Sequence, residues 1–118
     1  MTNDVRAQLL AAGAAANQLP VSDYTGLRPG ATYYAVDPAT GISWAGAALA
    51  PSASSFQAQV AAQDDGSYFV FEKAPGGTWV ARQDGLGGIQ GSTCPLPIPA
   101  AVLALWQWPA GTCRPPGP

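Results

Sequence analysis

The residues that could do chemistry in this chain are few, and histidine is absent from its 118 residues. Histidine is the commonest general base, a frequent metal ligand and the usual sensor of physiological pH. Its absence excludes a nucleophile–base pair of the familiar kind. A serine–lysine pair would need Lys73, which follows Glu72 in a strand-like run without the Ser-x-x-Lys spacing of such enzymes. Side-chain catalysis is therefore left to the carboxylates.

The acidic residues, seven in all, do not form a recognisable catalytic pair in the sequence. Glycoside hydrolysis needs two carboxyl groups that face each other across roughly 5–10 Å. Asp64 and Asp65 are adjacent in a turn and point in different directions. Partners could come only through the fold, from Asp23, Asp37, Glu72 or Asp84. We predict that the chain is not an enzyme and keep a carboxylate-dependent hydrolase as a third hypothesis.

Metal and cofactor sites are not indicated either. The run 64–66 has the composition of a calcium-binding loop, but the full spacing and the terminal glutamate are missing. Cys94 and Cys113 are too few for a structural zinc site and are not spaced as a Cys-x-x-Cys redox pair. The glycine-rich run 84–92 lacks the spacing of a phosphate-binding loop. We expect no metal and no cofactor.

The charge pattern limits the partners that the chain can bind. Only 10% of its residues are charged and the net charge is −2, so there is no basic field for nucleic acid. The longest apolar stretch near the start, residues 9–16, is too short to span a membrane. It also lacks the cationic flank of a signal peptide. We therefore expect neither nucleic-acid binding nor a membrane span.

The cysteine pair predicts export. An even number of cysteines in a chain rich in glycine and proline and poor in lysine fits one disulfide in an oxidising compartment. The alternative is two buried free thiols in a cytosolic protein. A Cys94–Cys113 bridge would close a loop around a short helix and stabilise the fold by roughly 3 kcal/mol. The expected location is secreted or extracytoplasmic, with the leader absent from this sequence.

The aromatic residues offer a binding function. Flat, rigid rings bury a large area at small entropic cost, which suits sugar stacking or a protein interface. We expect Trp108 and one of Tyr33 and Tyr34 to be exposed, and we take Trp44 as a further contact candidate. The predicted partner is a protein or a glycan, and a homo-oligomer is compatible with the pattern. The alternative is that these rings fill the core and the seam between helix and sheet.

The pattern of apolar and turn residues predicts a single α+β domain over residues 1–118. A helix is expected at 2–18, a five-stranded antiparallel meander at 31–83, a short helix from 100 to about 107 inside the 94–113 segment, and a disordered tail at 114–118. A cystatin-like or nuclear-transport-factor-like wrapped sheet is an analogy for this layout. The predicted strands are 31–36, 42–49, 56–63, 68–73 and 78–83.

Individual elements carry more specific expectations. Alternating apolar and amide residues from Phe56 to Gln63 predict a half-buried strand. Gly46 and its neighbouring alanines indicate an edge strand or a bend. Gly13 weakens the first helix, which we expect to dock on the sheet through a stripe that includes Leu9. Residues 68–73 are apolar on both faces, so we expect both faces of the sheet to be covered.

The run QDDGSYFVFEKAPGGTW, followed by CPLPIPAAVLALWQW and a closing cysteine, resembles small exported proteins of actinobacteria whose function is uncharacterised. The resemblance covers residues 22–114 and lies in the layout of the chain. It implies an extracytoplasmic location and a lipoprotein or secreted leader, and it supplies no activity.

The leading hypothesis is a non-catalytic, secreted or cell-envelope binding module of unknown ligand. A second hypothesis is a proteinaceous inhibitor of an extracellular enzyme that acts through the CPLPIP run, 94–99, or the GLGGIQGS run, 85–92.

Overall fold

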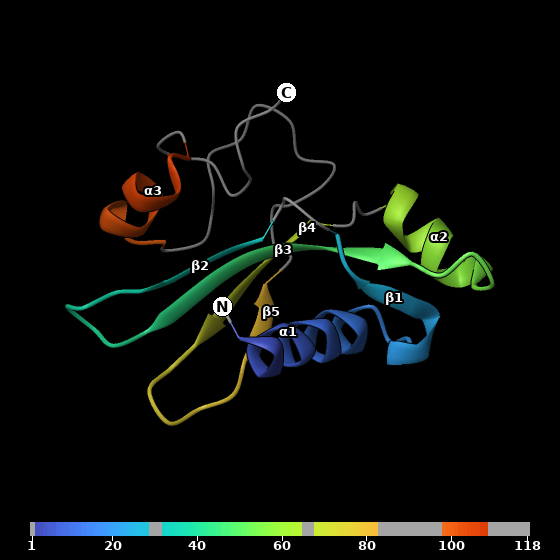
Figure 1. Cartoon of the computed structure of the whole chain (residues 1–118), viewed down its shortest axis with the longest axis horizontal. Helices are drawn as coiled ribbons and strands as arrows, with labels where there is room; N and C mark the ends of the chain where they lie inside the picture. The colour runs from blue at the N-terminus through green and yellow to red at the C-terminus, as the bar shows by residue number, and fades with distance from the viewer. Residues whose placement is uncertain (1, 29–31, 65–67, 83–97, 109–118) are drawn as a thin grey trace.

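A five-stranded antiparallel sheet is the centre of the protein, and helices lie on both of its faces (Figure 1). The computed structural model describes residues 2–28, 32–64, 68–82 and 98–108. The elements are α1 (Asn3–Ala16), a 3-10 turn η1 (Val21–Asp23), β1 (Tyr24–Leu27), β2 (Tyr33–Val36), β3 (Ser43–Pro51), α2 (Phe56–Asp64), β4 (Tyr68–Lys73), β5 (Val80–Arg82) and α3 (Ala100–Trp106). The predicted α+β class, with its N-terminal helix and antiparallel sheet, is confirmed.

Strand β3 is the hub of the sheet. One of its edges pairs with β4, which in turn pairs with β5. The other edge pairs with β2 near its start and with β1 near its end, so β1 and β2 lie one after the other along the same edge. The backbone N–H of Arg28 extends this edge by donating to the carbonyl oxygen of Ala48 at 2.7 Å. The arrangement therefore differs from a simple meander.

The expectation that β3 is an edge strand is wrong. Residues 44–49 are all buried, and β3 has strand neighbours on both sides. Its small residues, Ala45 to Ala48, are what allow large groups to approach both of its faces. A strand of small side chains is compatible with a central position when aromatic residues on neighbouring strands fill the space above and below it.

Helix α1 covers one face of the sheet, as predicted. Leu9 is fully buried there, and Val5, Leu10 and Ala12 are partly buried beside it. Phe69 and Phe71 of β4 point to the same face, with ring centroids 5.9 Å apart. This core comprises Leu9, Ala14, Tyr24, Ala45, Ala47, Leu49, Ala58, Phe69, Phe71 and Trp79.

Helix α3 covers the opposite face. The alternate residues of the strands point there, among them Trp44 and Val70, which are 1% and 0% exposed. The helix contributes Val102 and Trp106 to the same core. The predicted two-sided burial of the sheet is therefore confirmed. This second core comprises Ala35, Trp44, Val70, Ile98, Val102, Trp106 and Trp108.

The predicted strand at 56–63 is wrong, because these residues form helix α2. Alanine and glutamine are good helix formers and poor strand formers, so their propensities outweigh the alternating pattern. Ser55 caps the helix, since its Oγ accepts from the backbone N–H of Ala58 at 3.1 Å. Gln59 adds a second tie, because its side-chain amide donates to the carbonyl oxygens of Ser52 and Ala53 at 3.0 and 3.1 Å.

The sheet still has five strands because β1 forms at residues 24–27, where no strand is predicted. The remaining predicted elements are confirmed within a few residues, α1, β4 and α3 among them. The turn of 37–41 closes with the Gly41 N–H donating to the Asp37 carbonyl oxygen at 2.8 Å, and Gly41 adopts φ +75°.

Cys94, Cys113, the glycine-rich run and the tail lie outside the described residues. No described helix has the length and apolarity to cross a bilayer.

Gly13 has a packing role that its sequence context does not reveal. It is buried where α1 meets β3, and a Cβ atom there would lie 2.8 and 2.9 Å from the two methyl carbons of Leu49. Leu49 is itself only 1% exposed, so its side chain has little room to move. The glycine therefore sets how closely α1 can approach the sheet.

We expect Gly13→Ala to lower the free energy of unfolding by about 1–2 kcal/mol, because overpacking outweighs the gain in helix propensity. In a Leu49→Ala background the same substitution should instead raise it by up to about 1 kcal/mol, since the space is then free. Urea unfolding of the four proteins of this cycle measures both values. Stabilisation by Gly13→Ala in the wild-type background would contradict this account.

Candidate binding site

The sheet separates the four aromatic residues that the sequence predicts as ligand contacts. Tyr33, Trp44 and Trp108 lie on the α3 face, whereas Tyr34 lies on the α1 face, as the alternation along β2 requires. Tyr33 packs against Trp108 and Trp106 with ring centroids 5.3 and 5.8 Å apart. The centroids of Trp106 and Trp108 are 4.8 Å apart. Three of the four candidates therefore belong to the α3-side core or pack against it.

The predicted exposure of Trp108 is wrong, since only 4% of its surface is exposed. Gln107 ends α3 in a left-handed conformation with φ +61°, which turns the chain back over the helix. The backbone N–H of Trp108 then donates to the carbonyl oxygen of Leu103 at 2.9 Å. This is the hydrogen bond of a helix C-cap, and it directs the indole into the core. Trp44, at 1% exposure, is also a core residue.

Tyr34 is the most exposed member of the predicted set, with 38% of its surface exposed. Its ring centroid lies 6.1 Å from that of Trp79, and the two planes are tilted by 58°. Trp79 belongs to the α1-side core and is 8% exposed. The pair marks the part of this sheet face where the described chain opens to solvent.

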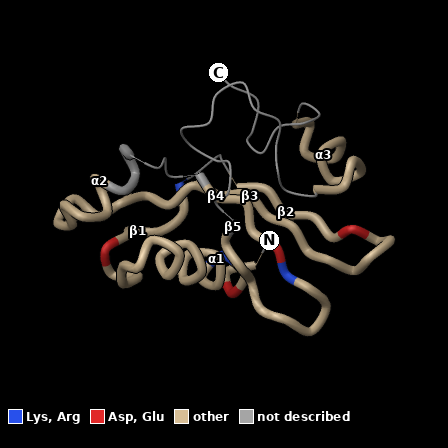
Figure 2. Tube along the Cα trace, turned by 180° about the vertical axis from the view of Figure 1, so that it is seen from behind, with Lys and Arg blue, Asp and Glu red and all other residues tan. Residues whose placement is uncertain are grey.

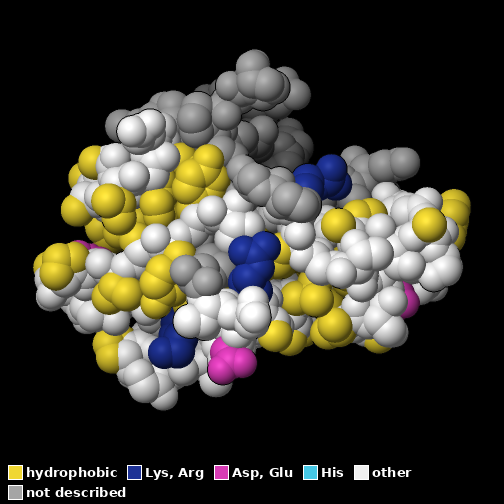
Figure 3. All heavy atoms as spheres, viewed as in Figure 1, with side chains coloured by type: hydrophobic (Ala, Val, Ile, Leu, Met, Phe, Trp, Pro, Cys, Tyr) yellow, Lys and Arg dark blue, Asp and Glu magenta, His cyan; other side chains and the backbone are white. Residues whose placement is uncertain are grey.

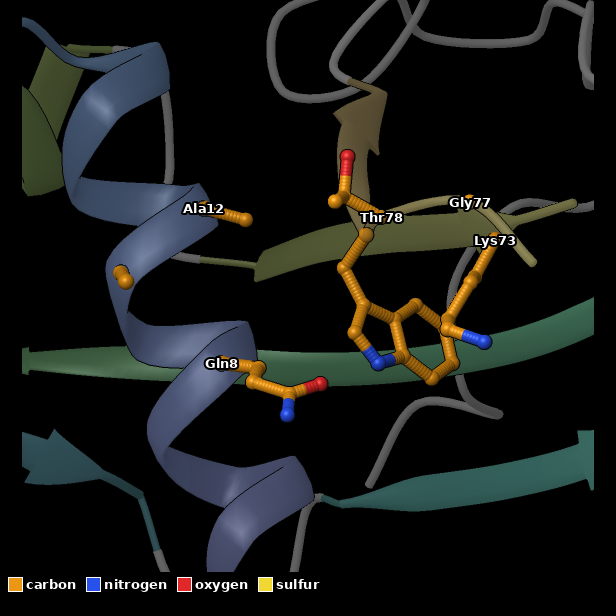
Figure 4. A pocket seen from close by; sticks show the side chains of 7 residues that line it. Gln8, Ala12, Lys73, Gly77 and Thr78 are labelled. Carbon is orange, nitrogen blue, oxygen red and sulfur yellow. The ribbon is translucent and has the colours of Figure 1, made fainter.

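A pocket of about 570 Å³ lies beside this pair, between α1 and the hairpin that joins β4 to β5. Figure 4 shows Gln8 and Ala12 projecting from the helix toward the hairpin that carries Lys73, Gly77 and Thr78. The described lining consists of Gln8, Ala11, Ala12, Lys73, Gly77, Thr78 and Trp79.

The hairpin turn positions one wall of this pocket. The N–H of Gly77 donates to the carbonyl oxygen of Ala74 at 2.9 Å, and Gly76 takes φ +75°, which glycine adopts without strain. Lys73 is the last residue of β4 and pairs across to Ser43 on β3. Ser43 and Ala45 are two positions apart on β3 and therefore lie on the same face of the sheet. Because both side chains are small, the indole of Trp79 can extend over this part of the sheet.

The lining combines apolar walls with three hydrogen-bonding side chains. Ala11, Ala12 and Trp79 are the apolar components, and the polar ones are the Gln8 amide, the Thr78 hydroxyl and the Lys73 ammonium. Lys73 is the single lysine of the sequence. No carboxylate is among the described lining residues. The site can hold a small molecule through hydrogen bonds and one positive charge.

The surrounding charges are sparse, as the few blue and red segments of Figure 2 show. Glu72 precedes Lys73 but lies on the opposite face of the sheet, toward α3. Its paired residue on β3 is Trp44, which belongs to the α3-side core. Asp4 lies on α1 one turn before Gln8, is exposed, and does not line the pocket. Lys73 is therefore the charge that dominates the described part of the pocket.

None of the carboxylates that the structure describes lines this pocket. Asp37 is 6% exposed and committed to its turn, where it accepts from the Ala39 N–H at 3.2 Å and from the Thr40 hydroxyl at 2.9 Å. Within the part of the chain that the structure describes, no three acidic or cysteine side chains are grouped to hold a metal ion. Asp65 and Asp84 lie outside the described residues.

An apolar surface lies elsewhere, over α3. Figure 3 shows apolar side chains gathered above this helix, and Leu105 on it is 69% exposed. The aromatic residues of α3 do not form that surface, since Trp106 is turned inward and 6% exposed.

Sequence reasoning missed the pocket because its residues come from separate elements. Gln8 lies on the polar side of a helix, and Thr78 and Trp79 resemble ordinary hairpin residues. One sequence feature could have indicated the pocket: the single lysine lies six positions before a tryptophan, with a glycine turn between them. A hairpin brings such residues to one side of a sheet.

Comparisons with protein-family models, with curated proteins and with solved structures each return no match.

The two aromatic environments predict different effects of truncation. Trp108→Ala should lower the free energy of unfolding by about 3–5 kcal/mol, as expected for a buried tryptophan. Tyr34→Ala should lower it by about 1 kcal/mol or less, because much of this ring is already in water. Thermal or urea unfolding of both variants tests this difference, and a neutral Trp108→Ala would show that its indole is not a core group.

Proposed function

We propose that the protein is a non-catalytic binding module that acts outside the cytoplasm and holds a small ligand between α1 and the β4–β5 hairpin. The observation that carries this proposal is the pocket of about 570 Å³, whose described lining joins apolar walls to three hydrogen-bonding side chains. Its volume lies within the range of small-molecule sites, which are apolar with a few placed polar groups.

The composition of the pocket supports binding over hydrolysis. A carboxylate-dependent hydrolase needs two facing carboxyl groups, and the described lining contributes none. Asp37 is held by its own turn, as described above. The inhibitor hypothesis depends on the runs 85–92 and 94–99, which lie outside the described residues except for Ile98 and Pro99. It therefore stays a prediction without a supporting contact.

The extracytoplasmic location is proposed from the cysteines and from the resemblance of the sequence to small exported actinobacterial proteins. Helix α3 lies between Cys94 and Cys113 in the sequence and packs on the sheet through Val102 and Trp106. A helix of this length is marginal alone, so a bridge between the segments that flank it would add to its packing energy. We therefore include the Cys94–Cys113 disulfide in the proposal.

Filling the pocket should abolish ligand binding. Ala11 is an exposed helix residue in the lining, and Ala11→Trp places an indole in the pocket without touching the core. We expect saturation-transfer NMR to detect glucose, N-acetylglucosamine, 2-naphthoate or 2-naphthamide on the wild-type protein. The signal should be lost in Ala11→Trp.

The matched control is Ala16→Trp, which adds the same group at an exposed position of α1 outside the lining. This variant should bind as the wild type does. Binding that survives Ala11→Trp, or the absence of any signal from the wild-type protein, would show that the pocket is not the functional site.

The disulfide is tested by the intact mass of the protein after alkylation, before and after reduction. We expect no alkylation without reductant and two added groups after reduction, because both sulfurs of Cys94 and Cys113 are bonded. Light scattering on the same sample separates a bridge within one chain from a bridge between two chains. Two reactive thiols without reduction would contradict the proposed oxidising compartment.

A further inference from the structure

Among the residues that the structure describes, one charged side chain lines the pocket between α1 and the β4–β5 hairpin, and it is the positive Lys73. From this we infer that the ligand is a small, flat organic acid whose anionic group is bound by Lys73. This inference rests on the proposed function and specifies the chemical class of its ligand.

The walls of the pocket favour a flat apolar body. On the helix side they are the methyl groups of Ala11 and Ala12, and on the sheet side the indole of Trp79. Only 8% of Trp79 is exposed, so its ring does not form the open platform on which a sugar stacks. A planar hydrocarbon or aromatic ring fits between methyl groups and a mostly buried indole and removes their remaining surface from water.

The polar groups favour an anion at one end of that body. The ammonium of Lys73 supplies up to three donors and a full positive charge, and its side chain is half-buried. The amide of Gln8 and the hydroxyl of Thr78 are further donors on the two sides of the pocket. A carboxylate accepts from several such donors at once, and charge-assisted hydrogen bonds are the stronger ones.

The charges near the pocket leave Lys73 available for such a ligand. Glu72 lies on the other face of the sheet and therefore does not face the pocket beside Lys73. Asp4 is the nearest carboxylate along α1, one turn from Gln8 and exposed. Because solvent screens exposed charges, Asp4 should weaken the attraction for an anion without cancelling it.

The test uses two ligands of almost equal shape, 2-naphthoate and 2-naphthamide, which differ by one negative charge. Their affinities for the wild-type protein are measured by titration calorimetry at low ionic strength. We expect naphthoate to bind roughly five- to tenfold more tightly than naphthamide, as one partly exposed charge-assisted contact would give. The preference should shrink when salt is added.

Lys73→Gln removes the charge and keeps a side chain of similar length. It should abolish the preference for naphthoate, so that the two ligands bind with equal affinity. Arg28→Gln is the matched control, because it removes one exposed cation near the other end of β3, beside Ala48. The control should keep the full preference. Asp4→Asn should increase the affinity for naphthoate alone.

A second measurement uses the unaltered protein and so does not depend on how a variant folds. Lys73 is the single lysine, so its acetylation by an N-hydroxysuccinimide ester can be followed by peptide mass. Naphthoate should slow acetylation of Lys73 more than naphthamide does, while acetylation of the chain's α-amino group stays the same.

The outcomes separate this inference from the proposed function. Equal affinity of the two naphthalene ligands, or a preference that survives Lys73→Gln, overturns the organic-acid inference. If binding in either case is lost in Ala11→Trp, the binding function of the pocket stands. Sugar binding that Ala11→Trp abolishes, with no naphthoate binding, also overturns only the inference. No binding of any probe to the wild-type protein overturns both.

Discussion

The small side chains at the centre of β3 are the constraint on which the rest of the structure depends, because they leave room for large groups on both faces of the sheet. Ala45 and Ala47 present only methyl groups toward α1, and Gly46 and Ala48 present no more toward the α3 face. Phenylalanines of β4 and tryptophans from the flanking segments then occupy the space that larger β3 side chains would take. Larger residues in β3 would push both layers outward at once.

The candidate pocket follows from the same constraint. Because Ser43 and Ala45 are small, Trp79 can lie across this end of the sheet and reach the ring of Tyr34. Farther along β3, Gly13 of α1 packs against Leu49, and the missing Cβ lets the helix approach the sheet closely. The helix and the hairpin therefore face each other with Trp79 between them, and Gln8 and Lys73 come from opposite walls. The positions of small residues thus determine where the pocket forms.

Much of the fold could be predicted from the sequence, and its errors have physical causes. Pro and Gly fix the turns at 37–41 and 75–77, and strong patterns define α1 and β4. The segment 56–64 is a helix because alternation built from alanine and glutamine is a weak strand signal against their helix propensity. β1 was missed because Gly26 and a register shift interrupt its short pattern.

The site could be predicted far less well than the fold. Trp108 was expected at the surface because a proline follows it, yet Gln107 reverses the chain first and buries it. Tyr33 and Tyr34 could be assigned to opposite faces from their adjacency, but only the tertiary structure says which face is open. Lys73 and Gln8 line one pocket because a helix packs beside a hairpin, and no local sequence pattern records that packing.

Helix α2 has a consequence for how this architecture can change. β3 and β4 are antiparallel neighbours, so the chain between them needs only to reverse direction, and a two- to five-residue turn suffices elsewhere. Here the reversal includes a helix, which joins the α1-side core through Ala58 alone among its described residues. The segment around α2 is thus an insertion in the geometric sense. Evolution could lengthen, shorten or replace it while the sheet and both helical layers stay intact.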